Sequence, residues 1–357
     1  MIPTRVRTRL VLRLGLALLV ILAAAALTGT GPVSARVPTN VFAPESTHAW
    51  VIYRYTLLVL AITGAIFVVV AGLLAYAIVR FRQRKGDDTT EPPQVYGSEQ
   101  VEIAWTVIPV IIVIVLVLTT ARTIHEIQDA PRPPGSLEVT AIGRQWWWEF
   151  RYPSLGIVTA NELHIPVSDR ANPTPTFLRL LSADVAHSFW VPRLAGKTDL
   201  IPNRVNQMWM DPSQPGLYLG QCAEYCGTQH AKMLLRVYVH KREDFDRWVA
   251  EQKAPAAVAA DVAIASEVAS GKRIFETTAC LNCHAVAGTV ANGRFGPDLT
   301  HLMSRETLAS GAVKNTAENL KLWIQEPDAL KPGSLMPPMH LEDRELNALV
   351  SYLVTLK

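Results

Sequence analysis

The segment Cys222-Ala-Glu224-Tyr-Cys226-Gly-Thr-Gln-His230-Ala-Lys-Met233 is the most informative part of this sequence. It gathers two thiols, an imidazole and a thioether on one short loop, and His187, in Ala186-His187-Ser188-Phe189-Trp190, offers a second imidazole. Soft sulfur donors combined with imidazoles select copper over hard cations. Two thiolates on one loop can bridge two copper ions, so that each ion takes one histidine. Met233 and a backbone carbonyl near Glu224 then fill the weak axial positions, and the segment predicts a dinuclear copper centre for electron transfer.

Two other interpretations use the same residues. A structural zinc site would need two cysteines and two histidines, but it gives no role to Met233. A disulfide between Cys222 and Cys226 is the second alternative if the segment lies in an oxidising compartment. Copper is favoured because it accounts for the methionine and because a haem motif follows.

Short runs of β-branched and aromatic residues surround these ligands, at 137–142, 146–152, 176–181, 205–210 and 234–240. Pro, Gly, Asn and Asp break the runs. Short strands with frequent turn signals are typical of an all-β sandwich or barrel. We therefore predict one copper-binding β domain over residues 131–250.

The second pair of cysteines lies in Cys280-Leu-Asn-Cys283-His284. A Cys-x-x-Cys-His string is the attachment motif of c-type haem. The two thiols would form thioethers with the haem vinyl groups, and His284 would become the proximal iron ligand. A thioredoxin-like redox pair is the alternative, but that motif belongs in a βαβ setting that the surrounding sequence lacks.

A methionine further along should supply the sixth iron ligand, since Met–His ligation raises the haem potential as an electron carrier requires. Met336, in Lys331-Pro-Gly-Ser-Leu-Met336-Pro-Pro-Met339, is the preferred candidate. Met339 is second and Met303 third. The Ala-rich segment 251–265 reads as a linker to this domain, which covers 266–357 and closes with an amphipathic helix over 343–357.

Two long uncharged runs, 55–79 and 103–121, are long enough to cross a membrane. Basic residues at 80–85 mark the cytoplasmic side, so the chain beyond 122 should lie outside the cytoplasm. The hairpin domain is expected over 36–130. Residues 1–35 pass from arginines through an apolar run to small residues ending at Ala35, the pattern of a cleaved signal peptide; a first transmembrane helix is the alternative.

Composition supports a multidomain membrane protein. The chain has 357 residues, of which 49% are hydrophobic and only 18% charged, below the usual quarter for a soluble protein. The net charge of +3 gives no support for nucleic-acid binding. Four cysteines in two close pairs are too few for a disulfide scaffold.

Further motifs carry a family resemblance. They are Glu102-Ile-Ala-Trp105-Thr106-Val-Ile-Pro109, Gly143-Arg-Gln145-Trp146-Trp147-Trp148-Glu-Phe150, Ala186-His187-Ser188-Phe-Trp-Val-Pro192, Lys197-Thr198-Asp199-Leu-Ile-Pro202-Asn-Arg204 and Pro215-Gly216 through Met233. With them, residues 45–250 resemble subunit II of the haem–copper cytochrome c oxidases. Residues 266–357, with Gly296-Pro297-Asp298-Leu299, resemble a small class I cytochrome c, and the fusion is similar to caa3-type oxidases. The resemblance implies a two-helix transmembrane hairpin, a cupredoxin-like Greek-key β-barrel and an all-α class I cytochrome c domain.

The resemblance also assigns roles to single residues. The side chain of Glu224 would reach a magnesium ion at the interface with subunit I, and Trp146 would be an exposed aromatic through which electrons enter the copper site. Glu102 would lie near the mouth of a proton channel of subunit I. The copper ligands implied are His187, Cys222, Glu224, Cys226, His230 and Met233. Related quinol oxidases lack the cysteines, which disfavours that activity.

The expected function is that of an electron-input subunit in a bacterial plasma membrane, with two membrane passes and both cofactor domains outside. Covalent haem c would take electrons from a soluble or membrane-bound donor. Two copper ions would pass them to subunit I, where oxygen would be reduced to water and protons would be pumped. This chain has no set of intramembrane histidines for a haem–copper pocket, so it is expected to supply electrons and not to reduce oxygen itself. Subunit III and membrane lipid are further expected partners.

Three alternatives remain at this point. The same input module could serve a copper-containing nitric oxide reductase. The chain could be a membrane-anchored electron carrier without an enzyme partner. A copper-delivery protein is disfavoured because delivery needs no haem.

Overall fold

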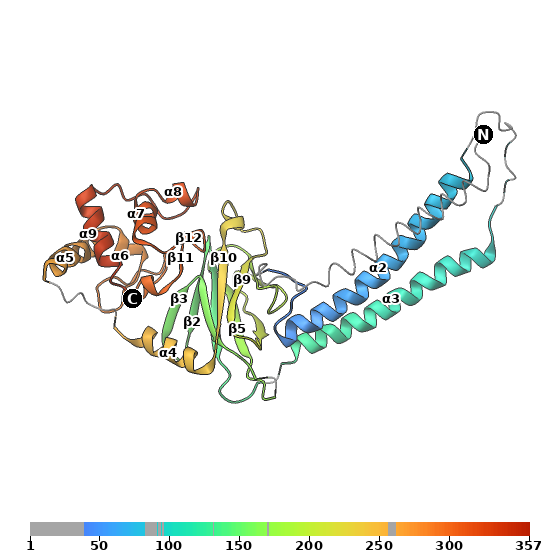
Figure 1. Ribbon diagram of the computed structural model, residues 1–357, viewed down its shortest axis with the longest axis horizontal. Coiled ribbons are helices and arrows are strands. Elements are labelled where there is room, and N and C mark those ends of the chain that lie inside the picture. Colours follow the sequence, from blue (N-terminus) through green and yellow to red (C-terminus); the bar gives the residue numbers. More distant parts are fainter. Residues whose placement is uncertain are drawn as a thin grey trace, which may run out of the picture.

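The computed structural model describes residues 39–82, 91, 94, 96–130, 132–169, 171–255 and 262–357. The predicted signal peptide, 1–35, and part of the basic loop at 80–85 lie outside the described residues. In the described part, two long helices, two β-sheets and a helical C-terminal unit follow one another along the molecule (Figure 1).

The two long helices are α2 (Thr47–Arg80) and α3 (Glu99–Gln128). They run side by side away from the β-sheets (Figure 1), and the Tyr55 hydroxyl lies 2.6 Å from Oγ1 of Thr120. No residue is buried in the most apolar 18-residue segment of either helix, so these surfaces are available to contact lipid or another chain. Both helices extend past the predicted runs 55–79 and 103–121, because polar residues continue the helix outside the hydrocarbon region. The Ser46 hydroxyl caps α2 by accepting from the Ala49 N–H.

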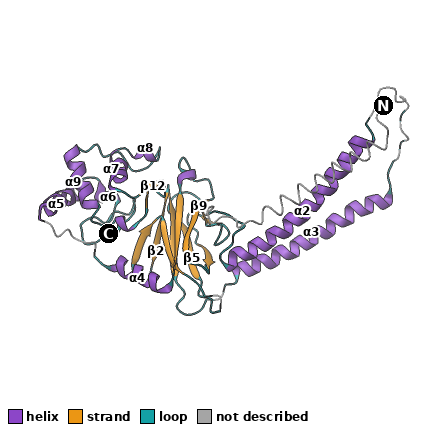
Figure 2. Cartoon of the chain, viewed as in Figure 1, coloured by secondary structure: helices purple, strands orange, loops and turns teal. Residues whose placement is uncertain are grey.

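Two five-stranded sheets form the middle domain (Figure 2). The first has the order β3-β2-β1-β5-β8 and the second β4-β10-β9-β6-β7. β1 pairs in parallel with β5, and β4 with β10, whereas the other pairs are antiparallel. The strands are β1 (Glu138–Arg144), β2 (Trp147–Tyr152), β3 (Ile157–Ala160), β4 (Glu162–Pro166), β5 (Thr176–Ser182), β6 (His187–Trp190), β7 (Thr198–Leu200), β8 (Asn206–Met210), β9 (Gly216–Cys222) and β10 (Leu234–His240).

Alternating side chains from both sheets fill one apolar core, with Trp148, Phe150 and Phe189 fully buried. This is the cupredoxin-like arrangement that the sequence predicts. Helix α4 (Arg242–Lys253) follows the last strand and adds Phe245 and Trp248 to the same core.

The C-terminal unit is mainly helical and has its own core around Phe275, Leu349 and Tyr352. Helices α5 and α9 cross closely, since a Cβ on Gly271 would lie 1.9 Å from the carbonyl oxygen of Ala348. Its elements are α5 (Val262–Thr277), α6 (Cys280–Cys283), β11 (Thr307–Leu308), β12 (Val313–Lys314), α7 (Ala317–Gln325), α8 (Pro327–Leu330) and α9 (Asp343–Leu353). Because α4 ends at Lys253 and α5 begins at Val262, helical residues lie within the predicted linker 251–265.

Candidate copper and haem sites

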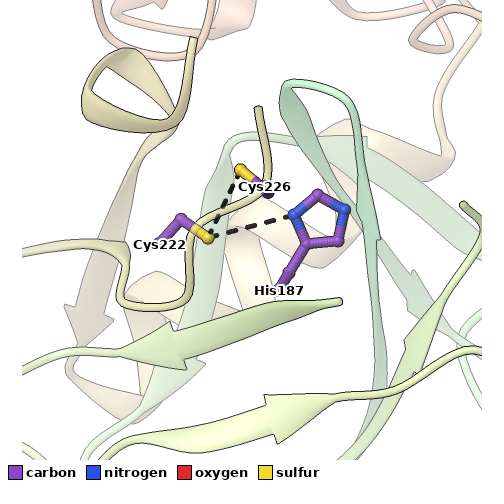
Figure 3. A group of neighbouring side chains, drawn as sticks. All are labelled: His187, Cys222 and Cys226. Atoms are coloured by element: carbon purple, nitrogen blue, oxygen red, sulfur yellow. Dashed lines mark hydrogen bonds between the residues drawn. The ribbon is translucent and has the colours of Figure 1, made fainter. Parts of the chain in front are cut away.

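The sulfur atoms of the loop after β9 converge with two imidazoles. The Sγ atoms of Cys222 and Cys226 are 3.8 Å apart. Nδ1 of His187, at the start of β6, lies 3.9 Å from Sγ of Cys222 (Figure 3). Nδ1 of His230 lies 3.6 Å from Sγ of Cys226. Both cysteines are free and buried, so no disulfide joins them.

The two axial donors of the predicted copper centre lie beside the same cysteines. Sδ of the fully buried Met233 is 3.8 Å from Sγ of Cys226. The carbonyl oxygen of Glu224 is 3.2 Å from Sγ of Cys222. All six predicted donors therefore come together, and this mixture of sulfur, imidazole and carbonyl donors fits copper. The side chain of Glu224 is exposed.

The charge of the thiol pair also favours a cation. The hydrogen bond between the two thiols lowers the pKa of Cys222 well below its usual value. The pKa of Cys226 is raised because its proton is held in that hydrogen bond. A second thiolate could form only next to the first, so positive metal ions are needed to neutralise the pair.

His187 is oriented by Asp184, which no sequence motif singled out, and by Gly143. Its Nε2 lies 2.8 Å from Oδ1 of Asp184, which leaves Nδ1 directed at Cys222. Burial opposes a charge on His187, but the hydrogen bonds with Asp184 and Cys222 raise its pKa overall. Gly143 gives the ring its space, since a Cβ there would lie 2.7 Å from Cδ2 of His187. In the sequence, the signal for this contact is the carboxylate of Asp184, three residues before His187.

Trp146 lies directly beside the copper loop, and it is buried. Its Nε1 donates a 2.9 Å hydrogen bond to the carbonyl oxygen of Cys226, and Nε2 of Gln145 donates to the same oxygen at 2.8 Å. Trp146 is only 9% exposed. The expectation of an exposed aromatic is therefore wrong, because the C-terminal unit covers this face.

The haem-motif residues line a large apolar cavity. Cys280, Cys283 and His284 meet Met336 and Met339 in its wall. Nδ1 of His284 donates a 2.7 Å hydrogen bond to the carbonyl oxygen of Pro297, which leaves Nε2 unprotonated for iron. Gly296 has to be glycine, since a Cβ would lie 2.6 Å from Cε1 of His284. These donors and the apolar wall fit a covalently bound haem. Met303 packs against the domain core but is not in the cavity wall.

The same cavity reaches the copper domain. Gln145, Trp146, Trp147 and Asn161 form its wall on the copper-domain side. The two cofactor sites therefore share Trp146, which lines one and hydrogen-bonds a ligand residue of the other.

Glu102 lies in the first turn of α3, and its side chain is exposed. This turn is at the end of the helical hairpin far from the β-sheets (Figure 1). Glu102 therefore takes no part in either cofactor site.

The fold and the two sites define a membrane-anchored protein in which a cupredoxin-like copper domain is fused to a cytochrome c. Comparison with sequence families agrees. Residues 43–122 match the transmembrane domain of cytochrome c oxidase subunit II, residues 171–239 match its periplasmic domain, and residues 268–357 match cytochrome c.

Curated relatives match over most of their length. Cytochrome c oxidase subunit 2 of Alkalihalophilus pseudofirmus is 33% identical over 323 residues, covering 88% of this chain and 90% of the relative. The subunit 2 of Bacillus sp. (strain PS3) is 36% identical, covering 78% and 80%. The chain belongs to the cytochrome c oxidase subunit 2 family, and it is a subunit of a haem–copper oxidase that acts together with subunit I.

Solved structures give weaker similarity. The periplasmic domain of subunit II of cytochrome oxidase from Bradyrhizobium japonicum is 29% identical with a TM-score of 0.32, covering 34% of this chain and 97% of that domain. A haem–copper terminal oxidase dimer has a chain that is 22% identical with a TM-score of 0.31, covering 40% of this chain and all of that one. Family membership rests on the sequence relatives.

Proposed function

We propose that this chain is the electron-input subunit of a respiratory oxidase. It takes electrons from an external donor and delivers them to subunit I, where oxygen is reduced to water and protons are pumped. The observation that carries the proposal is the shared position of Trp146, in the wall of the haem cavity and 2.9 Å from the carbonyl oxygen of Cys226. One aromatic side chain thus links the two cofactor sites.

The proposed ligands follow from the donors that converge. Cys280 and Cys283 would attach the haem covalently, and His284 and Met336 would bind its iron. Cys222 and Cys226 would hold two copper ions with their thiolates. The remaining copper donors are His187, Glu224 through its carbonyl, His230 and Met233. When bound, haem and copper each take up and release single electrons.

The surrounding protein does the positioning. Asp184 fixes the ring of His187, and Pro297 fixes the ring of His284, each through one hydrogen bond. Rings that are held in place need little rearrangement when the charge of a bound metal changes, which favours fast electron transfer. Burial of both cysteines keeps water from the copper site.

The membrane arrangement is part of the proposal. We infer a bacterial plasma-membrane location, with domains at 36–130, 131–250 and 266–357, a cleaved leader at 1–35 and a linker at 251–265. The exposed carboxylate of Glu224 would share a magnesium ion with subunit I, since carboxylates suit that ion. Glu102 would lie near the mouth of a proton channel in subunit I. A donor that is soluble or membrane-bound, and subunit III, complete the proposed assembly.

Metal analysis with electron paramagnetic resonance tests the copper assignment. Two copper ions per chain with a delocalised signal support it, and zinc or a four-line single-copper spectrum overturns it. Oxygen uptake by the purified complex, with nitric oxide as the competing substrate, separates an oxidase from a nitric oxide reductase. Co-purification of a partner with many membrane spans excludes a lone carrier.

A further inference from the structure

Two buried charged side chains cross the boundary between the copper domain and the cytochrome domain. The first is Glu162 on β4, which is 1% exposed. Its carboxylate accepts hydrogen bonds from the backbone N–H groups of Glu306 and Thr307, at 2.9 and 3.0 Å, and from the Thr307 hydroxyl at 3.1 Å. All three donors belong to the cytochrome domain. A buried carboxylate destabilises a protein unless it is fully hydrogen-bonded. Here the cytochrome domain supplies these hydrogen bonds, so the burial of Glu162 depends on the contact between the two domains.

The second buried charge belongs to the cytochrome domain and contacts the copper domain. Lys331, in the loop between α8 and Met336, is 4% exposed. Its Nζ donates to the carbonyl oxygen of Trp146 at 2.7 Å and to that of Ala309 at 3.2 Å. One ammonium group therefore ties the methionine-bearing loop to the residue that links the two cofactor sites.

Burial disfavours the charged form of both side chains. Burial raises the pKa of Glu162, although the hydrogen bonds from the cytochrome domain oppose this. Burial lowers the pKa of Lys331 to about 7. Neither side chain would meet this cost if the domains were separate, since both would then be hydrated.

Weaker contacts surround the two charges. The Ser310 hydroxyl donates to the carbonyl oxygen of Leu234 at 2.8 Å, and the Gln229 amide donates to the carbonyl oxygen of Pro332. Gln229 directly precedes the proposed copper ligand His230. Hydrogen bonds between the two domains thus involve β4, the start of β10 and the copper loop.

We propose that Glu162 and Lys331 are positioning residues that lock the cytochrome domain over Trp146, so that an external donor can reduce the copper centre only by way of the haem. The inference rests on the proposed function, because it assigns a route to the same electrons. A flexible tether alone would leave Trp146 open to the donor for part of the time. Directional hydrogen bonds to buried charges select one docked arrangement, whereas an apolar contact of the same size could slide.

Amide hydrogen exchange tests the lock without reference to activity. The full-length chain, loaded with copper and haem in detergent, is compared with Glu162→Gln and Lys331→Met. We expect the Glu306 and Thr307 amides to exchange at least roughly ten-fold faster in Glu162→Gln, as for loss of a hydrogen bond to a charged group. The exposed Glu138→Gln and Lys241→Met are the matched controls, since both residues lie outside the β11–β12 ladder that contains Thr307.

Lys331→Met distinguishes a lock from a local defect, because Lys331 does not contact Glu306 or Thr307. Faster exchange of these two amides in Lys331→Met supports the lock, since opening at one charge frees the other. Unchanged exchange there overturns it, even if Glu162→Gln alone has an effect.

Stopped-flow reduction by a reduced soluble cytochrome c tests the route. In the wild type we expect copper reduction to follow haem reduction and to be independent of donor concentration. In the Glu162→Gln/Lys331→Met variant we expect a second copper phase whose rate rises with donor concentration. The same single phase in both proteins overturns the lock. A wild type in which copper is never reduced through the haem overturns the proposed function instead.

Discussion

The indole nitrogen of Trp146 donates a 2.9 Å hydrogen bond to the carbonyl oxygen of Cys226, while the backbone carbonyl of Trp146 accepts one of 2.7 Å from Lys331. One residue therefore contacts a proposed copper ligand on one side and the cytochrome domain on the other. The backbone contact survives any substitution of the side chain, whereas the indole contact does not.

Replacing Trp146 by phenylalanine should slow electron transfer from haem to copper several-fold. The ring stays apolar and aromatic, but the hydrogen bond to Cys226 is lost. Flash-induced electron transfer in the full-length chain measures the rate. Trp147→Phe is the control, since Trp147 lines the same cavity without a hydrogen bond to Cys226. Equal rates in the two variants would remove Trp146 from the proposed route.

Replacing Met233 by leucine should change the redox potential of the copper centre while the copper content stays close to two per chain. The two side chains have similar volumes, so the buried site should fold, and a weak axial ligand tunes potential more than affinity. Redox titration with metal analysis measures both quantities. Met210→Leu is the control, because Met210 is equally buried in the core away from the loop. A zinc site would show no response to either change.

Replacing Met336 by leucine should leave the haem covalently attached and lower its redox potential. The thioether is the proposed sixth ligand, and its loss removes the stabilisation of the ferrous state that Met–His ligation gives. Carbon monoxide should then bind the reduced haem at the freed position. Met339→Leu is the control from the same cavity wall. Carbon monoxide binding in Met339→Leu but not in Met336→Leu would exchange the two assignments.

The copper loop could be predicted because its donors lie within twelve residues, and only His187 had to come from elsewhere. The haem motif is local in the same way. Asp184 was missed because a carboxylate near a histidine is common in sequences, and only the fold shows that it holds Nε2.

The burial of Trp146 could not be predicted from local pattern. Lys331 lies 185 residues further along the chain, in a segment that the sequence assigns to a separate domain. Neither residue has a neighbour in sequence that signals the contact. Docking between two independently recognisable domains depends on surface complementarity, which periodicity and motifs do not encode.

Replacing Gly271 by alanine should destabilise the cytochrome domain by about 1–3 kcal/mol, the usual cost of overpacking. Alanine favours a helix by about 1 kcal/mol over glycine. Here the added methyl group would lie 1.9 Å from the backbone oxygen of Ala348, which cannot rotate away, so the clash should win. Thermal unfolding followed by haem absorbance measures the change. A more stable variant would mean that α5 and α9 can separate at no cost.

The copper domain should lose stability as the pH falls below about 6.5, because of two stacked histidines. Nδ1 of His164 and Nε2 of His240 are 2.8 Å apart, and the His164 ring stacks on Trp248. Burial lowers the pKa of both rings below 6.5, aided for His164 by His240 and Arg305 and opposed for His240 by Asp244.

The sign follows from proton counts. Between the lowered pKa values and 6.5, the unfolded chain binds protons at both rings and the folded chain does not. The free energy of unfolding therefore falls with decreasing pH, with a slope approaching about 1.4 kcal/mol per pH unit for each ring. The contribution is fully present above pH 6.5 and is lost below it.

His164→Phe keeps the stacking area but removes one titrating ring. Its melting temperature should therefore depend less on pH between 7.5 and 5.5, a window set by these shifts. His125→Gln, at an exposed histidine near the end of α3, should keep the wild-type dependence. Parallel curves for wild type and His164→Phe would show that the buried pair does not control acid stability.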